Sequence, residues 1–187
     1  MSTIESTATT GQLLTPGTWS VDPSHSSVEF QVKHMGLATV KGFFGEFQGA
    51  LTVADDGTIS AEGTVQAASV NTRNGQRDEH LRSPDFFDVE THPELSFRST
   101  AFEAIDEETY RVTGELTIRG VTREIVLEAV SQGTDIDPWG NTRVGLEAVA
   151  QIERADYGLT WNQALESGGV LVGKKVKLLL DISAVKA

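Results

Sequence analysis

The stretch "TYRVTGELTIRG", residues 109–120, alternates strictly between apolar or small residues and polar residues. The first set is Tyr110, Val112, Gly114, Leu116 and Ile118. The second set is Arg111, Thr113, Glu115, Thr117 and Arg119. Successive side chains of a β-strand point to opposite faces, so a period of two separates the two sets. The stretch therefore predicts a strand with one face in a core and the other in water.

The same period of two runs through most of the chain outward from this stretch. The other strand-like runs cover residues 28–34, 43–53, 59–67, 95–101, 125–129, 144–152 and 176–182. Turn sequences such as "ADDGT" (54–58) and "RGVT" (119–122) separate them, which indicates antiparallel neighbours. We expect an all-β protein with about eight strands. Closure into an up-and-down barrel would remove exposed edges, and a two-sheet sandwich is the alternative.

The composition narrows the choice of protein class. A length of 187 residues without an internal linker predicts one domain. The net charge of -12 argues against nucleic acid as a partner and predicts repulsion from anionic membrane surfaces. The absence of cysteine excludes disulfides and thiolate metal sites. No apolar run approaches the roughly 18 residues of a membrane span, so we expect no stable membrane insertion.

The N-terminal sequence "MSTIESTATTGQLLTPGTW" is rich in Ser and Thr. It has neither the basic segment nor the apolar run of a signal peptide, so we expect a cytoplasmic protein. The composition predicts a disordered tail over residues 1–16, followed by a barrel domain over residues 17–187.

The interior of an eight-stranded barrel is either filled by side chains or holds one small ligand. Many positions on the predicted inward face are small, which favours a cavity over a packed core. These positions are Gly45, Gly49, Ala61, Gly63, Ala67, Ser99, Ala101, Gly114, Ala129, Ala148 and Ala150. A 13-residue strand at 58–70 would span roughly 40 Å, so the lumen would suit a long, narrow, apolar ligand. The residues predicted to line it are Phe30, Val32, Phe43, Phe47, Leu51, Ala61, Val65, Phe97, Val112, Leu116, Leu146 and Ala148.

The polar residues indicate no metal site and no cofactor. The four histidines lack the spacing of a ligand pair, and there is no nucleophile elbow or phosphate-binding glycine loop. His34 falls on the inward face at a strand end, where it needs a partner. That partner is either a neighbouring protein group or water, or the polar head of a ligand. Position and charge make His34, Arg73 and Arg77 the head-group candidates.

The alternation stops at residues 74–93. Ser83 and Pro84 can open a helix or turn, and "GQRDEHL" before them has the composition of a short helical turn. Leu81, Phe86 and Phe87 need burial, which the open end of a barrel offers. We therefore expect a short helical cover, pinned outside by pairs between its arginines and nearby carboxylates. The second break, at 155–173, is also expected to cross a barrel end.

Four segments resemble the YceI-like family of polyisoprenoid-binding proteins. They are "TWSVDPSHSSVEFQVKHMGLATVKGFFGEFQG" (18–49), "NTRNGQRDEHLRSPDFFDVETHPELSFRST" (71–100), "VTGELTIRGVTREIVLEA" (112–129) and "RADYGLTWN" (154–162). The resemblance spans about residues 17–185. It implies a lipocalin-like antiparallel barrel with a helical cover and a long hydrophobic tunnel. It also implies binding of an isoprenoid or a similar long-chain amphiphile, with no catalysis.

The leading hypothesis is therefore a carrier or store for a long-chain lipid. One alternative is an enzyme acting on an isoprenoid-like small molecule with His34 as acid or base. Another is an interaction protein whose lumen is packed. A homodimer is compatible with all three hypotheses.

Overall fold

The computed structural model describes residues 14–187, and the first thirteen residues of the predicted tail lie outside this range. Strands dominate the fold. They are β1 (Gly17–Val21), β2 (Ser27–His34), β3 (Ala38–Phe44), β4 (Phe47–Val53), β5 (Ile59–Gln66), β6 (Val70–Asn71), β7 (Glu94–Ala104), β8 (Thr109–Ile118), β9 (Val121–Ile136), β10 (Thr142–Glu153) and β11 (Val172–Lys186). The helices are α1 (Gly75–Arg82) and the short 3-10 turns η2 (Pro23–His25), η3 (Ala67–Ser69) and η4 (Arg154–Tyr157).

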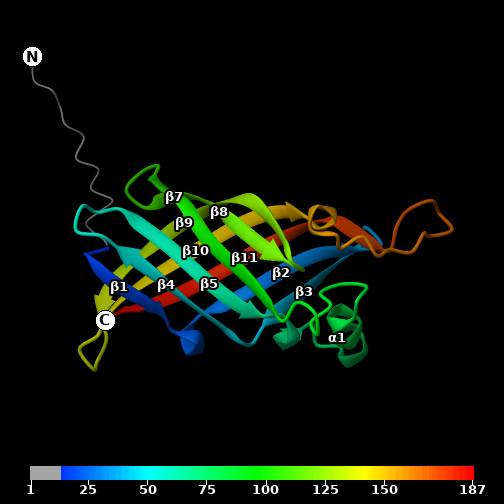
Figure 1. Ribbon diagram of the computed structural model, residues 1–187, viewed down its shortest axis with the longest axis horizontal. Coiled ribbons are helices and arrows are strands. Elements are labelled where there is room, and N and C mark those ends of the chain that lie inside the picture. The colour runs from blue at the N-terminus through cyan, green and yellow to red at the C-terminus, as the bar shows by residue number, and fades with distance from the viewer. Residues whose placement is uncertain (1–13) are drawn as a thin grey trace, which may run out of the picture.

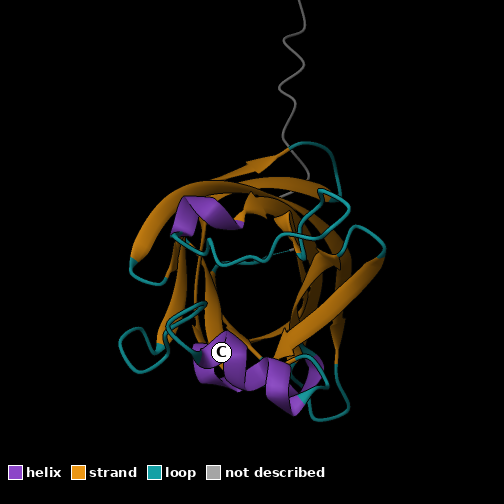
Figure 2. Cartoon of the chain, turned by 90° about the vertical axis from the view of Figure 1, so that its right-hand side faces the viewer, coloured by secondary structure: helices purple, strands orange, loops and turns teal. Residues whose placement is uncertain are grey.

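The strands close into an eight-stranded antiparallel barrel (Figures 1 and 2). Three of its eight paths are each broken once: β1 and β2 at η2, β3 and β4 at Gly45 and Glu46, and β5 and β6 at η3. The long strand β11 completes the ring, because it pairs with β10 on one side and with β1 and β2 on the other. The predicted lipocalin-like barrel is confirmed, and the sandwich alternative is wrong.

Burial along the strands follows the alternation in the sequence. In β8, Tyr110, Val112 and Leu116 are buried, whereas Arg111 and Glu115 are exposed. The apolar face therefore lines the barrel, because that arrangement removes the most hydrocarbon from water.

A small apolar cluster fills one end of the barrel, here called the Trp19 end. The Trp19 ring is fully buried and its Nε1 donates to the carbonyl of Thr15 at 3.1 Å. Leu14 packs into the same cluster, with only 1% of its surface exposed. Leu14, inside the predicted tail of residues 1–16, is thus part of this cluster.

The other end carries α1 and the loops around it, and is here called the cover end (Figures 1 and 2). Asn74 caps α1 by accepting a hydrogen bond from the Arg77 backbone N–H at 3.0 Å. The buried Asp78 carboxylate accepts from the backbone N–H and the hydroxyl of Thr72, at 2.8 and 2.6 Å. These bonds fix the helix to the end of β6.

The predicted pairs between cover arginines and carboxylates are wrong. Arg77 donates to the carbonyl of Thr72 at 2.8 Å, and Arg82 donates to the carbonyl of Ala68 at 3.0 Å. Within residues 14–187 neither arginine lies within 4.0 Å of a carboxylate. The acceptors lie in η3 and just after β6, and they include the Thr72 hydroxyl, which accepts from Arg77 at 2.7 Å.

Candidate functional site

The barrel encloses an apolar cavity of about 230 Å³, here called the inner chamber. Its wall comes from inward-facing residues of strands on all sides of the barrel, such as Leu51, Phe97 and Leu180. The volume exceeds the about 150 Å³ of an engineered apolar cavity that takes up benzene. The interior is therefore not fully packed, and the packed-lumen alternative loses its main support.

A second cavity of about 250 Å³ lies between the barrel and the cover, here called the outer chamber. The barrel contributes Phe30 and Val32, and the cover contributes Leu81, Phe86 and Phe87. Trp161, from the loop after η4, stacks against Phe86 with ring centres 5.5 Å apart. The two segments that interrupt the alternation both lie over an end of the barrel, as predicted, and the structure shows that they meet at the same end.

The two chambers meet at a constriction formed by four residues that line both. These residues are Phe44, Leu95, Ile118 and Leu178. The Phe44 ring lies 5.7 Å from the ring of Phe30 and 5.7 Å from that of Phe87. Along β11 the lining runs from Ile182 to Val172, roughly 30 Å of strand. The chambers therefore adjoin along the barrel, with these four side chains between them.

Eleven of the twelve predicted lining residues face one of these chambers. Phe30 and Val32 line the outer chamber. The inner chamber is lined by Phe47, Leu51, Ala61, Val65, Phe97, Val112, Leu116, Leu146 and Ala148. The prediction for Phe43 is wrong: it lies opposite Glu29 and Asn71, whose face is the outside of the barrel. The break at Gly45 and Glu46 shifts the alternation, so that Phe44 and Phe47 both point inward.

Sequence reasoning also missed several lining residues. A bulge in β7 between Ser99 and Ala101 turns Phe102 inward and Ala101 outward, because Phe102 pairs with Val112. No local signal marks this bulge. By contrast, the alternation at 176–182 did indicate Leu178, Leu180 and Ile182, which line the inner chamber.

The small inward residues make space in two different ways. At Gly114 the Phe97 ring fills the space, because its nearest atom would lie only 2.5 Å from an added Cβ. Gly49 and Gly63 face each other across β4 and β5, and both line the inner chamber. A Cβ on Gly49 would stand 2.9 Å from the Glu62 carbonyl oxygen, so the small residues there allow a close approach of the two strands.

Basic side chains and histidines form part of the lining of the outer chamber. His34 and Arg77 line it, together with Lys33 and His80. The His80 Nε2 lies 2.9 Å from the Asp85 carboxylate, and its ring meets Trp161 edge-on at 4.6 Å. Arg73 is exposed and does not line the chamber, so the structure brings together two of the three predicted head-group residues.

Arg154 holds the η4 loop against β11. Its side chain donates to the carbonyls of Gly173 at 2.7 Å, Leu159 at 2.7 Å and Trp161 at 2.9 Å. The residue is only 6% exposed, and this burial lowers the pKa of its guanidinium group. Within the described chain no carboxylate lies within 4.0 Å of it. Arg154 therefore places a buried positive charge in the wall of the outer chamber.

No group of three or more His, Cys, Asp or Glu residues within 14–187 is arranged to hold a metal ion. No helix among these residues is both long enough and apolar enough to cross a membrane.

Comparisons with known proteins agree with this architecture. The model of the YceI-like domain family matches residues 19–184. A UPF0312 protein of Staphylococcus aureus strain N315 is 38% identical over 162 residues, which cover 85% of this chain and 92% of that protein. A crystal structure of a Campylobacter jejuni YCEI protein is 30% identical and superposes with a TM-score of 0.71, covering 83% of this chain and 90% of that one.

Two more distant structures share the fold. Burkholderia cenocepacia BcnA is 21% identical with a TM-score of 0.76, covering 87% of this chain and 98% of that one. A polyisoprenoid-binding domain from Saccharophagus degradans, implicated in plant cell wall breakdown, is 18% identical with a TM-score of 0.70. It covers 90% of this chain and 98% of its own.

Proposed function

We propose that this chain, which belongs to the YceI-like domain family, binds a long-chain apolar lipid in its two-chamber cavity and carries or stores it. The observation that carries the proposal is the pair of adjoining, mainly apolar chambers. The Trp19 cluster fills the end of the barrel beyond the inner chamber, and basic side chains and histidines form part of the lining of the outer chamber. A polyisoprenoid fits this shape. The polyisoprenoid-binding domain of similar fold supports the same ligand class.

The physical chemistry of the cavity favours a hydrocarbon chain. Each methylene group moved from water into the cavity contributes about 0.8 kcal/mol of binding free energy. The chain would extend through the constriction at Phe44, and its head would remain at the mouth. There Lys33, Arg77 and the buried charge of Arg154 favour a head that carries negative charge.

The proposed function is binding without catalysis. His34 is exposed at the mouth, and within residues 14–187 its side chain makes no hydrogen bond with a second acid or base. General acid–base catalysis usually needs such a positioned partner or a bound substrate within hydrogen-bond reach. The rim position of His34 suits contact with a head group.

The test uses two phenylalanines on opposite faces of the same wall. Phe47→Asp places a carboxylate in the inner chamber, whereas Phe43→Asp places one on the outside. We expect Phe47→Asp to abolish uptake of a fluorescent polyprenyl phosphate, because an unpaired charge in an apolar cavity is strongly unfavourable. Phe43→Asp should retain uptake. Circular dichroism checks that both variants keep their β-structure.

Mass spectrometry identifies the natural ligand. Protein purified without detergent should release about one lipid per chain into organic solvent, and native spectra should show the matching added mass. A protein free of lipid that gains no mass with added polyprenyl phosphate would contradict the proposal. Equal uptake by the Phe47→Asp and Phe43→Asp variants would contradict the assignment of the chamber.

A further inference from the structure

The lysines of this acidic chain are concentrated on one part of its surface. Lys33, Lys41, Lys174, Lys175 and Lys177 are all but one of the lysines in the sequence. They lie on β2, β3 and β11, which are neighbours in the barrel. The register places Gln31 opposite both Lys41 and Lys177, and a Cβ on Gly173 would stand 3.3 Å from that of Lys33. These five residues form one surface, here called the lysine patch.

The lysine patch is not neutralised by carboxylates. All five side chains are exposed, and within the described residues none lies within 4.0 Å of a carboxylate. The nearby acidic positions in the register are Glu153, opposite Lys175, and Glu29, one pair of residues along from Gln31. The local charge is therefore positive, although the net charge of the chain is -12.

Exposed apolar side chains stand beside the lysine patch. Leu37 is 82% exposed and Met35 is 43% exposed, in the turn between β2 and β3. Val170, in the loop before β11, is 42% exposed. The Met35 backbone N–H donates to the Leu171 carbonyl at 2.8 Å, so the turn and the loop touch. These three residues are here called the apolar tip.

The apolar tip borders the mouth of the outer chamber. His34, next to Met35, lines that chamber, and so do Leu171 and Val172. The turn, the loop and α1 all lie at the same end of the barrel (Figure 1). Lys41 is four residues from Leu37, roughly 13 Å along the strand. The lysine patch therefore lies on the barrel wall next to the apolar tip.

We propose that the lysine patch and the apolar tip dock the cover end onto an anionic lipid bilayer. Lysines near an anionic surface attract it, and exposed apolar residues ahead of them enter the interface. An anionic bilayer fits both features, whereas nucleic acid fits only the charge. The docked orientation turns the mouth of the outer chamber toward the bilayer. This step deepens the proposed function, because it makes the bilayer the source or acceptor of the carried lipid.

The opposite end of the barrel supplies a matched control. Trp139 is 81% exposed in the turn between β9 and β10, but its neighbours Asp135 and Asp137 are acidic. An exposed apolar residue without surrounding lysines should contribute little to binding of an anionic surface.

Sedimentation with lipid vesicles tests the docking. The vesicles contain phosphatidylcholine alone, or phosphatidylcholine mixed with phosphatidylglycerol. We expect the chain to bind only the mixed vesicles, and more weakly as salt is added. The triple variant Lys174→Glu, Lys175→Glu and Lys177→Glu should bind the mixed vesicles roughly a hundredfold more weakly. Leu37→Ser should weaken it several-fold, and Trp139→Ser should not change it.

The outcomes separate docking from lipid uptake. No binding to mixed vesicles, or equal binding by the triple lysine variant, would overturn the docking proposal. The proposal would also be overturned if the chain bound a short DNA duplex as tightly as the mixed vesicles and if Leu37→Ser left the affinity for DNA unchanged. Uptake of dispersed polyprenyl phosphate is measured in parallel without vesicles. Retained uptake with failed docking leaves the proposed function standing, and docking without uptake overturns the proposed function alone.

Discussion

Two inward-facing glycines each accommodate a phenylalanine ring from the neighbouring strand. A Cβ on Gly42 would overlap the ring of Phe30. A Cβ on Gly114 would stand 2.5 Å from the Phe97 ring and 2.6 Å from the Arg98 carbonyl oxygen. The ring can rotate away, but the carbonyl belongs to a strand pair and cannot. Both phenylalanines line the cavity, so these glycines help to set its shape.

Replacement of Gly114 by Ala should therefore destabilise the barrel. We expect the free energy of unfolding to fall by about 2 kcal/mol, the usual range for overpacking a core. Gly45→Ala is the control, because nothing lies within 4 Å of the added Cβ there. Urea denaturation measures both variants. Equal free energies of unfolding for Gly114→Ala and Gly45→Ala would show that β7 shifts enough to make room for the added methyl group.

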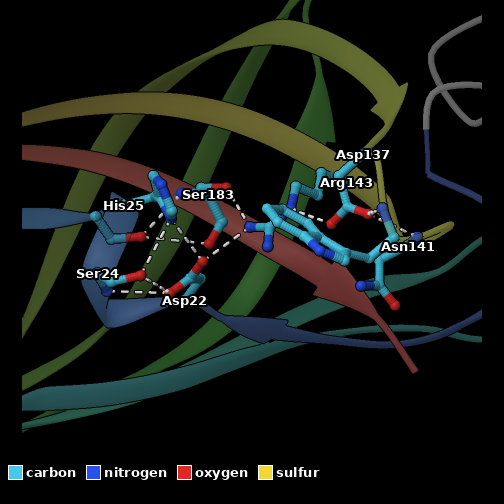
Figure 3. A network of polar contacts seen from close by, with 9 residues as sticks. Asp22, Ser24, His25, Asp137, Asn141, Arg143 and Ser183 are labelled. Carbon is cyan, nitrogen blue, oxygen red and sulfur yellow. Dashed lines mark hydrogen bonds and ion pairs between the residues drawn. The ribbon is translucent and has the colours of Figure 1, made fainter.

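At the scale of elements, one arginine joins three segments near the break between β1 and β2 (Figure 3). Arg143, at the start of β10, contacts Asp22 before η2 at 2.8 Å and Asp137 in the β9–β10 turn at 2.8 Å. Near η2 the wall is interrupted: β1 pairs with β4 as far as Ser20, and β2 pairs with β3 from Glu29 onward. The arginine thus fixes η2 where the strand ladder is broken.

These contacts shift the protonation of both carboxylates. The hydrogen bond from Arg143 is the main cause that lowers the pKa of Asp137 from 3.8 to about 2. The pKa of Asp22 lies well below its usual range, mainly through the Ser24 hydroxyl and then through Arg143 and His25. A lowered pKa in the folded state means that the stabilisation is complete above about pH 4 and is lost as the pH falls toward 2.

Arg143→Met should reduce this dependence on pH. We expect the variant to be less stable than the parent at pH 7, and the difference to shrink between pH 4 and pH 2. Urea unfolding at several pH values measures it. Arg98→Met removes a more exposed pair with Glu115, 3.3 Å long, and should change little at any pH. A constant difference across the range would show that Arg143 acts through packing alone.

At the scale of the whole molecule, lipid binding and folding are linked. A ligand that binds only the folded barrel stabilises it by about 1.4 kcal/mol for each tenfold rise in free ligand above its Kd. The cavity exists only when all eight paths of the barrel close around it, so an unfolded chain has no equivalent site.

The melting temperature should therefore rise steadily with added polyprenyl phosphate. Differential scanning calorimetry measures the rise, and the Phe47→Asp variant should show none. Co-purification of the lipid without any rise in melting temperature would show that the lipid binds elsewhere than the cavity.

The net charge of the whole chain does not describe how its charges are distributed over the surface. A net charge of -12 predicts repulsion from anionic surfaces, yet the lysines are gathered on three adjacent strands. Two of these strands, β2 and β11, are far apart in the sequence, so only barrel closure shows that their lysines form one patch. Salt screens interactions between exposed charges that are more than about 10 Å apart. At close approach, the local charge of the patch therefore matters more than the net charge of the chain.

The sequence by itself determined the barrel and most of its lining. Alternation of apolar and polar residues in β8 and β10 decides which face is buried, because side-chain direction along a regular strand has a period of two. The short cover was also evident, since Leu81, Phe86 and Phe87 need burial and interrupt that period.

Only the tertiary structure decided where the period fails and what fills the interior. The break before Phe47 and the bulge before Phe102 each shift the inward face by one residue, and both are seen only in the register of the strand pairs. The guanidinium groups of Arg77, Arg82 and Arg154 donate to backbone carbonyls, and Arg77 donates to the Thr72 hydroxyl as well; residue types do not reveal these partners. Whether a glycine leaves a cavity or admits a ring depends on the strand beside it, because volume is a property of packing.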